Sequence, residues 1–345
     1  MAFINLKFAV VGATGAVGRT LLSILAERGV PTENVCAIAS EHSIGVTVSY
    51  GEHSDLKIKA LPLFDFNHTD IAFFAVESDI AKLYIPKATE QGAIVIDKSS
   101  LFRMDKDVPL VVPEVNADAI ALAAKRRVIA NPNCSTIQLV AALKPIHDVS
   151  PIKRIVVSTY QAVSGAGQKA MDILFNETKT VLMNQPSTKN DLFPKPIAFN
   201  VIPKIDDFLP NGYTKEEMKV IDETKKILSA DIDVTATCVR VPVFIGHSIS
   251  ATVECTHAFD MKVIATSLKA SKALKIAKTS DQFFGPVEAA QEDEIFISRL
   301  RMDPSVPFGL SMWIVADNIR KGAALNGIQI AEALYRNHRG LLRKK

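Results

Sequence analysis

The stretch LKFAVVGATGAVG, residues 6–18, decides the fold. Residues 6–11 are almost all apolar, as in a short buried strand, and residues 17–28 have the apolar spacing of a helix. Glycines at positions 12, 15 and 18 lie at the junction. A strand, a tight glycine turn and a helix form the context of a dinucleotide fingerprint, because glycines let the backbone approach a pyrophosphate whose charge lies at the helix N-terminus. The sequence therefore predicts a dinucleotide site at this turn.

Strands and helices continue to alternate after this turn. Apolar segments at 34–40, 70–76 and 93–97 are predicted strands, and residues 78–90 form a predicted helix. Strands that are apolar on both faces and separated by helices indicate a doubly wound parallel sheet of the Rossmann type. We expect this dinucleotide-binding domain to span residues 1–132.

The pattern changes after Pro151. Strands rich in β-branched residues are predicted at 154–160, 234–241, 248–255 and 310–315, and helices at 167–179, 215–228 and 261–277. Several of these strands alternate polar with apolar residues, which predicts an α+β domain with a mixed sheet over residues 133–322. We expect a last helix within 323–345 to return to the first domain. Residues 184–200, which include three prolines, are an expected irregular loop.

Composition narrows the class of protein. The chain has 345 residues, and its 40 basic and 37 acidic residues are too evenly balanced to indicate nucleic-acid binding. Four widely spaced cysteines signal neither a disulfide framework nor a metal site. No signal peptide or membrane-spanning run is visible in the sequence. We expect a cytoplasmic protein that binds a small-molecule substrate.

One cysteine occupies an unusual position. The segment NPNCST, residues 131–136, lies between an apolar run at 128–130 and a helically spaced segment at 137–143. Cys134 therefore begins a helix, where partial positive charge favours a thiolate. A thiolate nucleophile needs a proton-transfer partner, and the best candidate is His247, on a glycine turn between two predicted strands. The remaining cysteines lie in strand signals and are interpreted as small apolar residues: Cys36, Cys238 and Cys255.

The residues that follow the second predicted strand should select the cofactor. They are Glu41, His42 and Ser43. An acidic side chain here can accept hydrogen bonds from a free ribose 2′-hydroxyl, whereas a 2′-phosphate favours arginine. This composition favours NAD or weak discrimination.

Further motifs follow one another along the chain. They are SSLFRM at 99–104, VPEVN at 112–116, Gln161 followed by SGAG at 164–167, EEMK at 216–219, and Arg240 seven residues before His247. With GATGAVG and NPNCST, they resemble the aspartate-semialdehyde dehydrogenase family over nearly the whole chain. The resemblance implies NADPH-dependent reduction of L-aspartyl 4-phosphate to L-aspartate 4-semialdehyde and phosphate. That reaction serves lysine, methionine, threonine and diaminopimelate synthesis.

The resemblance also implies roles for individual residues. Cys134 would form a thioester, His247 would act as the acid/base, and Gln161 would orient the acyl carbon. Arg240 would hold the substrate α-carboxylate and Glu216 the α-amino group. The phosphate would be bound by Arg103, Asn133 and Lys219. The cofactor would be bound by Gly12, Thr14, Gly15, Ala16, Val17, His42, Ser43, Ser164, Gly165 and Asn318. The expected assembly is a homodimer or a dimer of dimers that packs through the sheets of the second domain.

Two positions depart from the family pattern. The family usually has an Arg-Ser pair where this chain has His42 and Ser43, so NADP preference is open and NAD is possible. Where the family has small residues after the third strand, this chain has Ala75, Val76 and Glu77. Two alternatives also stay open: an enzyme like N-acetyl-glutamyl-phosphate reductase, and a non-catalytic dinucleotide-binding regulator with an unreactive Cys134.

Overall fold

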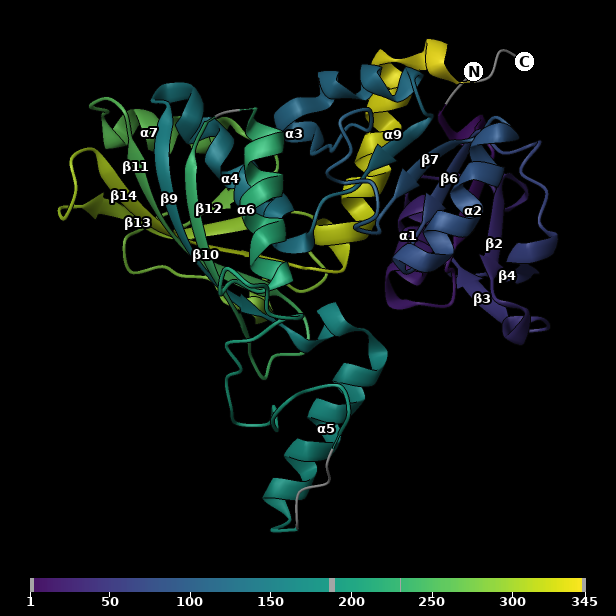
Figure 1. The fold of residues 1–345 in the computed structure, drawn as a ribbon, viewed down its shortest axis with the longest axis horizontal. Helices are drawn as coiled ribbons and strands as arrows, with labels where there is room; N and C mark the ends of the chain where they lie inside the picture. Colours follow the sequence, from purple (N-terminus) through teal and green to yellow (C-terminus); the bar gives the residue numbers. More distant parts are fainter. Residues whose placement is uncertain (1–2, 186–189, 230, 343–345) are drawn as a thin grey trace. The chain divides into compact units, whose positions relative to one another are not determined.

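The computed structural model describes residues 3–185, 190–229 and 231–342 (Figure 1). The chain forms two compact units. The first contains Met1–Asn133 and Ala323–Lys345, and the second contains Cys134–Gly322.

The first unit is built on a six-stranded sheet in the order β5-β2-β1-β6-β7-β8. All neighbouring strands are parallel. Every residue of β1, β6 and β7 is buried, which requires both faces of the sheet to be covered. The strands are β1 (Phe8–Val11), β2 (Val35–Ala39), β5 (Lys59–Ala60), β6 (Ile71–Phe74), β7 (Ile94–Asp97) and β8 (Val128–Ala130).

Helices and a small hairpin complete the first unit. α1 packs on β1, α2 packs on β6 and β7, and α9 also packs on β7. A buried cluster joins these helices to the sheet through residues such as Leu22, Phe73 and Ile328. The elements are α1 (Ala16–Glu27), the hairpin of β3 (Thr47–Tyr50) and β4 (Ser54–Lys57), α2 (Ser78–Glu90), α3 (Pro113–Asn116) and α9 (Asn326–Asn337).

The second unit is built on a mixed six-stranded sheet in the order β10-β9-β11-β14-β13-β12. The pairs β9/β10 and β12/β13 are parallel, and the other neighbours are antiparallel. The strands are β9 (Ile152–Gln161), β10 (Asp233–Arg240), β11 (His247–Cys255), β12 (Leu274–Ile276), β13 (Ile295–Asp303) and β14 (Gly309–Ala316).

Helices cover one face of this mixed sheet. α4 contacts β9, β11, β13 and β14, and it also packs against α6 and α7. Figure 1 shows α5 extending away from the sheet, beside the chain segment that follows it. The helices are α4 (Cys134–Val149), α5 (Gln168–Leu182), α6 (Lys215–Leu228), α7 (Met261–Ala270) and α8 (Pro286–Ala289).

The predicted fold class is confirmed, with differences in the second unit. The helix predicted at 261–277 ends at Ala270, and Leu274–Ile276 forms β12 instead. β13 was not predicted, because Arg299, Arg301 and Met302 are exposed in its second half and mask any apolar alternation. Residues 186–189 of the predicted loop lie outside the described residues. Among the residues that are described, none of the helices has the length and apolar content needed to cross a bilayer.

Candidate active site

Three of the predicted site residues lie at one end of the sheet in the second unit. β9 ends at Gln161 and β10 ends at Arg240, and these two residues are paired in register. β11 runs in the opposite direction and begins at His247, which pairs with Ala316 at the end of β14. The topology therefore brings together residues that are 86 positions apart in the chain, Gln161 and His247.

Cys134 is the first residue of α4. Four residues later on the same helix, the side-chain amide of Gln138 donates a hydrogen bond of 3.1 Å to the backbone oxygen of His247. Gly322 lies against the cysteine, since a Cβ atom at this position would be 2.9 Å from Cys134 Cβ. The start of α4 is thus tied to the turn that carries His247, and the space beside Cys134 requires a glycine.

His247 is fully buried, and its ring is oriented by the backbone. Nδ1 accepts a hydrogen bond of 3.0 Å from the amide of Ala162. Burial, and then the nearby Arg240 charge, hold the pKa of His247 well below its ordinary value, so the ring is neutral. Because Nδ1 accepts a hydrogen bond, the neutral ring must carry its proton on Nε2. Nε2 has no hydrogen-bond partner within the described part of the chain, so its buried N–H still requires an acceptor.

Arg240 presents a buried guanidinium group next to this histidine. Nη1 donates to the backbone oxygen of Ala162 at 2.7 Å. Burial lowers the pKa of Arg240, whereas the charge of Glu216 acts in the opposite direction. Gly165 lies close to both groups, because a Cβ there would be 3.1 Å from Arg240 Nη1 and 3.3 Å from His247 Nε2. The remaining guanidinium N–H groups are suited to a planar carboxylate.

The start of α6 is fixed by a capping box. The side chain of Thr214 accepts from the amide of Glu217, and Glu217 Oε2 accepts from the amide of Thr214 at 2.7 Å. Glu217 Oε1 also accepts from the amide of Cys238 on β10 at 3.0 Å. This buried carboxylate attaches the helix start to the sheet, and so fixes the positions of Glu216 and Lys219 on the first turns.

A chain of polar contacts connects these residues. Gln161 Nε2 donates to Glu216 Oε1 at 3.1 Å, and Lys219 Nζ donates to Glu216 Oε2 at 3.2 Å. Lys219 also donates to Asp206 Oδ2 at 2.9 Å. Burial acts to lower the pKa of Lys219, but the charges of Glu216 and Asp206 raise it overall. The lysine is therefore a fixed cation at neutral pH.

Asn318 connects two turns of the second unit. Its amide nitrogen donates to Ser164 Oγ at 3.0 Å, and its oxygen accepts from the amide of Gly246 at 2.9 Å. The structure thus places three predicted cofactor residues, Ser164, Gly165 and Asn318, beside the turn that carries His247.

The other predicted residues belong to the first unit. Arg103 is buried, with Nε donating to Asn131 O at 3.0 Å and Nη2 to Lys98 O at 2.7 Å. Asn133 is also buried. Both follow the carboxyl ends of parallel strands, β7 and β8, where ligands bind in open α/β sheets.

A cavity of about 300 Å³ lies at the same carboxyl edge in the first unit. Gly12, Thr14, Glu41, His42 and Val76 are among the residues that line it. Gly12 has φ of +86°, and a Cβ there would be 2.3 Å from the backbone oxygen of Ala75. Only glycine fits this turn, and α1 begins directly after Gly15. The turn, the helix start and the cavity fit a dinucleotide.

The remaining cofactor candidates occupy this same edge. Ala16 and Val17 open α1, and Ser43 ends a short 3-10 turn that begins at Glu41. Val76 fills space near Gly12, since its Cγ1 would be 3.1 Å from a Cβ at that glycine. The departure from the family pattern at Val76 therefore lies in the wall of the cavity.

Three polar or close-packed residues of these regions were not singled out from the sequence: Asp206, Gly322 and Asp97. Gly322 interrupts a helically spaced segment, which is a signal for close backbone approach. Asp206 and Asp97 gave no such signal.

Asp97 is fully buried at the end of β7, where its carboxylate accepts hydrogen bonds from the amide of Ser99 at 2.9 Å and from Ser99 Oγ at 2.7 Å. Burial raises its pKa to about 6.

The Asp97 carboxyl should make stability depend on pH. Its pKa is raised from 3.8 to about 6 in the folded state, so between these values the unfolded state releases the proton first. The free energy of unfolding should therefore fall as pH rises from about 4 to about 6, by about 3 kcal/mol in total. Asp97→Asn should lack this dependence. Urea unfolding of both proteins at pH 4 to 7 measures it, and a constant difference between them would contradict the assignment.

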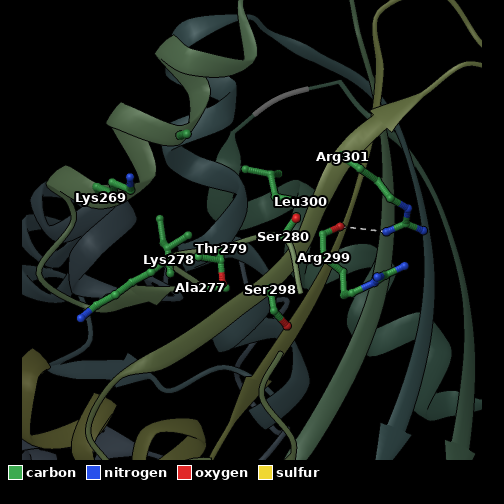
Figure 2. A pocket seen from close by; sticks show the side chains of 11 residues that line it. Lys269, Ala277, Lys278, Thr279, Ser280, Ser298, Arg299, Leu300 and Arg301 are labelled. Atoms are coloured by element: carbon green, nitrogen blue, oxygen red, sulfur yellow. Dashed lines mark hydrogen bonds between the residues drawn. The ribbon is translucent and has the colours of Figure 1, made fainter. Parts of the chain in front are cut away.

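A cavity of about 390 Å³ lies in the second unit near the end of β12. Ala277, Ser280 and Leu300 are among its lining residues. Figure 2 shows Lys278 extending to one side, while Arg299 and Arg301 extend to the opposite side. Lys269, which also lines the cavity, lies on the same side as Lys278, so the charges of the two sides do not converge in this view.

Comparison with known families defines the class of protein. Residues 7–123 match the family model of the semialdehyde dehydrogenase NAD-binding domain, and residues 143–321 match that of the semialdehyde dehydrogenase dimerisation domain. The first unit is therefore a pyridine-nucleotide domain of the semialdehyde dehydrogenases.

Individual relatives are more specific. The chain is 47% identical to the aspartate-semialdehyde dehydrogenase of Rickettsia conorii, across 96% of this chain and 98% of the relative. It is also 47% identical to that of Aquifex aeolicus, across the same 96% and 98%. The solved structure of aspartate semialdehyde dehydrogenase II from Vibrio cholerae superposes with a TM-score of 0.93 at 44% identity, covering 96% of this chain and 99% of that one. The chain belongs to the aspartate-semialdehyde dehydrogenase family of oxidoreductases.

Proposed function

We propose that the second unit performs the family reaction through a thioester on Cys134, and that it converts L-aspartyl 4-phosphate and a reduced nicotinamide cofactor to L-aspartate 4-semialdehyde and phosphate. The observation that carries this proposal is the placement of Cys134 at the start of α4, on the same helix turn that contacts His247. The test is phosphate-dependent reduction of NADP by the purified protein with L-aspartate 4-semialdehyde.

Cys134 begins the reaction as the nucleophile. Its thiolate sulfur forms a bond to the acyl carbon, and the carbon–oxygen bond to phosphate breaks, so that phosphate leaves with the electron pair and a thioester remains. The helix start favours the anionic sulfur, because the helix dipole places partial positive charge there. After reduction of the thioester, the carbon–sulfur bond breaks and the thiolate is regenerated with release of the aldehyde.

His247 supplies a hydrogen bond to the reacting oxygen. Its buried Nε2–H lacks a partner in the described part of the chain, and this missing acceptor supports a hydrogen bond to a substrate oxygen. A donor aimed at an oxygen that gains charge stabilises the tetrahedral species before and after the thioester. Gln161, held by Thr159 Oγ1 at 2.9 Å and by Glu216, orients the acyl carbon.

Arg240 and Glu216 select the amino-acid part of the substrate. A buried guanidinium suits the α-carboxylate, and a buried carboxylate suits a charged α-ammonium group. An N-acetylated amine has no positive charge, so Glu216 disfavours N-acetylglutamyl phosphate. Lys219 supplies a positive charge for the phosphate, and the family resemblance proposes a phosphate-binding role for Arg103 and Asn133 as well.

The cofactor belongs to the first unit, whose glycine turn and cavity fit a dinucleotide. When bound, it supplies the hydride that reduces the thioester. Gly12, Thr14, Gly15, Ala16 and Val17 provide the backbone and side-chain groups for its pyrophosphate. The family resemblance proposes Ser164, Gly165 and Asn318 as further cofactor-binding residues.

The adenosine end of the cavity should discriminate weakly between NADP and NAD. Glu41 and His42 line it, and both are exposed. An imidazole beside a carboxylate holds a 2′-phosphate less well than an arginine fork does. We expect His42→Arg to raise the ratio of kcat/KM with NADPH to that with NADH by about ten-fold. A wild-type ratio as high as that of the variant would contradict this account.

The dimerisation surface is the face of the second sheet opposite α4. Tyr160 and Trp313 lie on this face with ring centroids 5.3 Å apart, and Tyr160 is exposed. They belong to strands that are paired through β11. We expect a homodimer through this face, and Tyr160→Lys should shift the mass measured by analytical ultracentrifugation toward that of a monomer. An unchanged mass would place the interface elsewhere.

A further inference from the structure

Asp206 lies outside the elements that carry the proposed catalytic residues, yet it contacts one of them. Its Oδ2 accepts from Lys219 Nζ at 2.9 Å, and its Oδ1 accepts from the amide of Asp207 at 2.9 Å. The residue has φ of +68°, in the left-handed region that residues other than glycine rarely adopt. The local backbone is thus held in an uncommon conformation that turns the carboxylate toward Lys219.

The segment before Asp206 is anchored to the substrate site. Ile202 and Arg240 exchange two backbone hydrogen bonds of 2.9 Å each. Ile205, next to the aspartate, is buried. The chain four residues before Asp206 is therefore paired with the backbone of the proposed carboxylate-binding residue.

Lys219 is shared between two carboxylates. Its ammonium group has three N–H donors. One bonds to Asp206 and one to Glu216, at 2.9 Å and 3.2 Å. The Lys219 side chain is 29% exposed, so the remaining donor can reach a ligand.

We propose that Asp206 is a positioning residue that holds the Lys219 ammonium in place for the phosphate of the substrate and prevents it from pairing with Glu216 alone. The inference rests on the proposed phosphate-binding role of Lys219. Without Asp206, Lys219 would neutralise the carboxylate that receives the substrate ammonium. Loss of Asp206 should therefore weaken the use of both phosphate and L-aspartate 4-semialdehyde.

Asp206→Asn tests this role with little change in shape. Asparagine tolerates the left-handed conformation and keeps an oxygen for the Asp207 amide, but it lacks the charge that pairs with Lys219. In the phosphate-dependent oxidation of L-aspartate 4-semialdehyde, we expect kcat/KM for phosphate and for the semialdehyde to fall about ten-fold. KM for NADP should not change.

Asp207→Asn is the matched control. Asp207 is the next residue of the same loop, and its Oδ2 pairs with Lys215 at 2.8 Å, a lysine that has no proposed role in binding. Because this pair is exposed, the variant should stay within about two-fold of wild type. An equal fall in kcat/KM in both variants would overturn the proposal, because the effect would then come from a change in the whole loop and not from the Asp206–Lys219 contact. A lower KM for phosphate in Asp206→Asn would also overturn it, because Asp206 would then compete with the anion.

A failure of the proposed function itself would look different. In that case, wild-type NADP reduction would not depend on phosphate, or Lys219→Ala would leave KM for phosphate unchanged. Lys219→Ala could raise KM for phosphate while Asp206→Asn leaves kcat/KM unchanged for both phosphate and the semialdehyde. In that case, Lys219 keeps its role and only the positioning role of Asp206 is wrong.

Discussion

Cys134→Ala should abolish phosphate-dependent reduction of NADP by L-aspartate 4-semialdehyde. Without the sulfur no thioester forms, and the loss in kcat should be at least about 10⁴-fold. The variant should keep its fold, because alanine fits where Cys134 begins α4 and packs against Gly322. Stopped-flow absorbance of NADPH, together with circular dichroism, measures both properties.

Cys238→Ala is the control for this loss. Cys238 is a fully buried thiol on β10, and burial raises its pKa to about 12. A thiol with this pKa is not ionised at neutral pH and cannot serve as the nucleophile. We expect the control to keep most of the activity. A comparable loss in both variants would contradict the assignment of Cys134.

Arg240→Lys should produce the second-largest effect. Arg240 is buried, and its Nη1 is committed to the Ala162 backbone, so the planar group is held in one orientation. Lysine keeps the charge but cannot form two parallel hydrogen bonds to a carboxylate. We expect kcat/KM for L-aspartate 4-semialdehyde to fall by about 10²- to 10³-fold.

Steady-state kinetics with each substrate varied in turn tests this prediction. KM for NADP should stay near the wild-type value, because the carboxylate that Arg240 would hold belongs to the semialdehyde and not to the cofactor. Arg301→Lys, on an exposed part of β13, should have no effect. A loss confined to KM for NADP would show that Arg240 does not hold the substrate carboxylate.

The fold could be predicted where the sequence pattern reflects burial. β1, β6 and β7 are buried on both faces, and their uninterrupted apolar runs identified them. β12 and β13 could not be recognised in this way. β12 has only three residues, and its pairing with β13 supplies the stability that its own sequence lacks.

The candidate site was predictable only where residue type and motif spacing carry the information. Cys134, His247 and Arg240 were named from the sequence, and the structure places the last two at one end of the mixed sheet. The proton position on His247 depends on the amide of Ala162, which is 85 residues away in the chain. Asp206 reaches Lys219 through a left-handed backbone conformation. Contacts of this kind arise from tertiary packing, so no local pattern encodes them.

The most direct test of the mechanism is to trap the acyl-enzyme. The protein is mixed with L-aspartate 4-semialdehyde and NADP in the absence of phosphate, then quenched with acid, and its peptides are analysed by mass spectrometry. The thioester mechanism predicts one equivalent of NADPH formed in a burst, and an aspartyl group on the peptide that contains Cys134. A burst without an adduct, or an aspartyl group on another residue, would contradict the thioester mechanism.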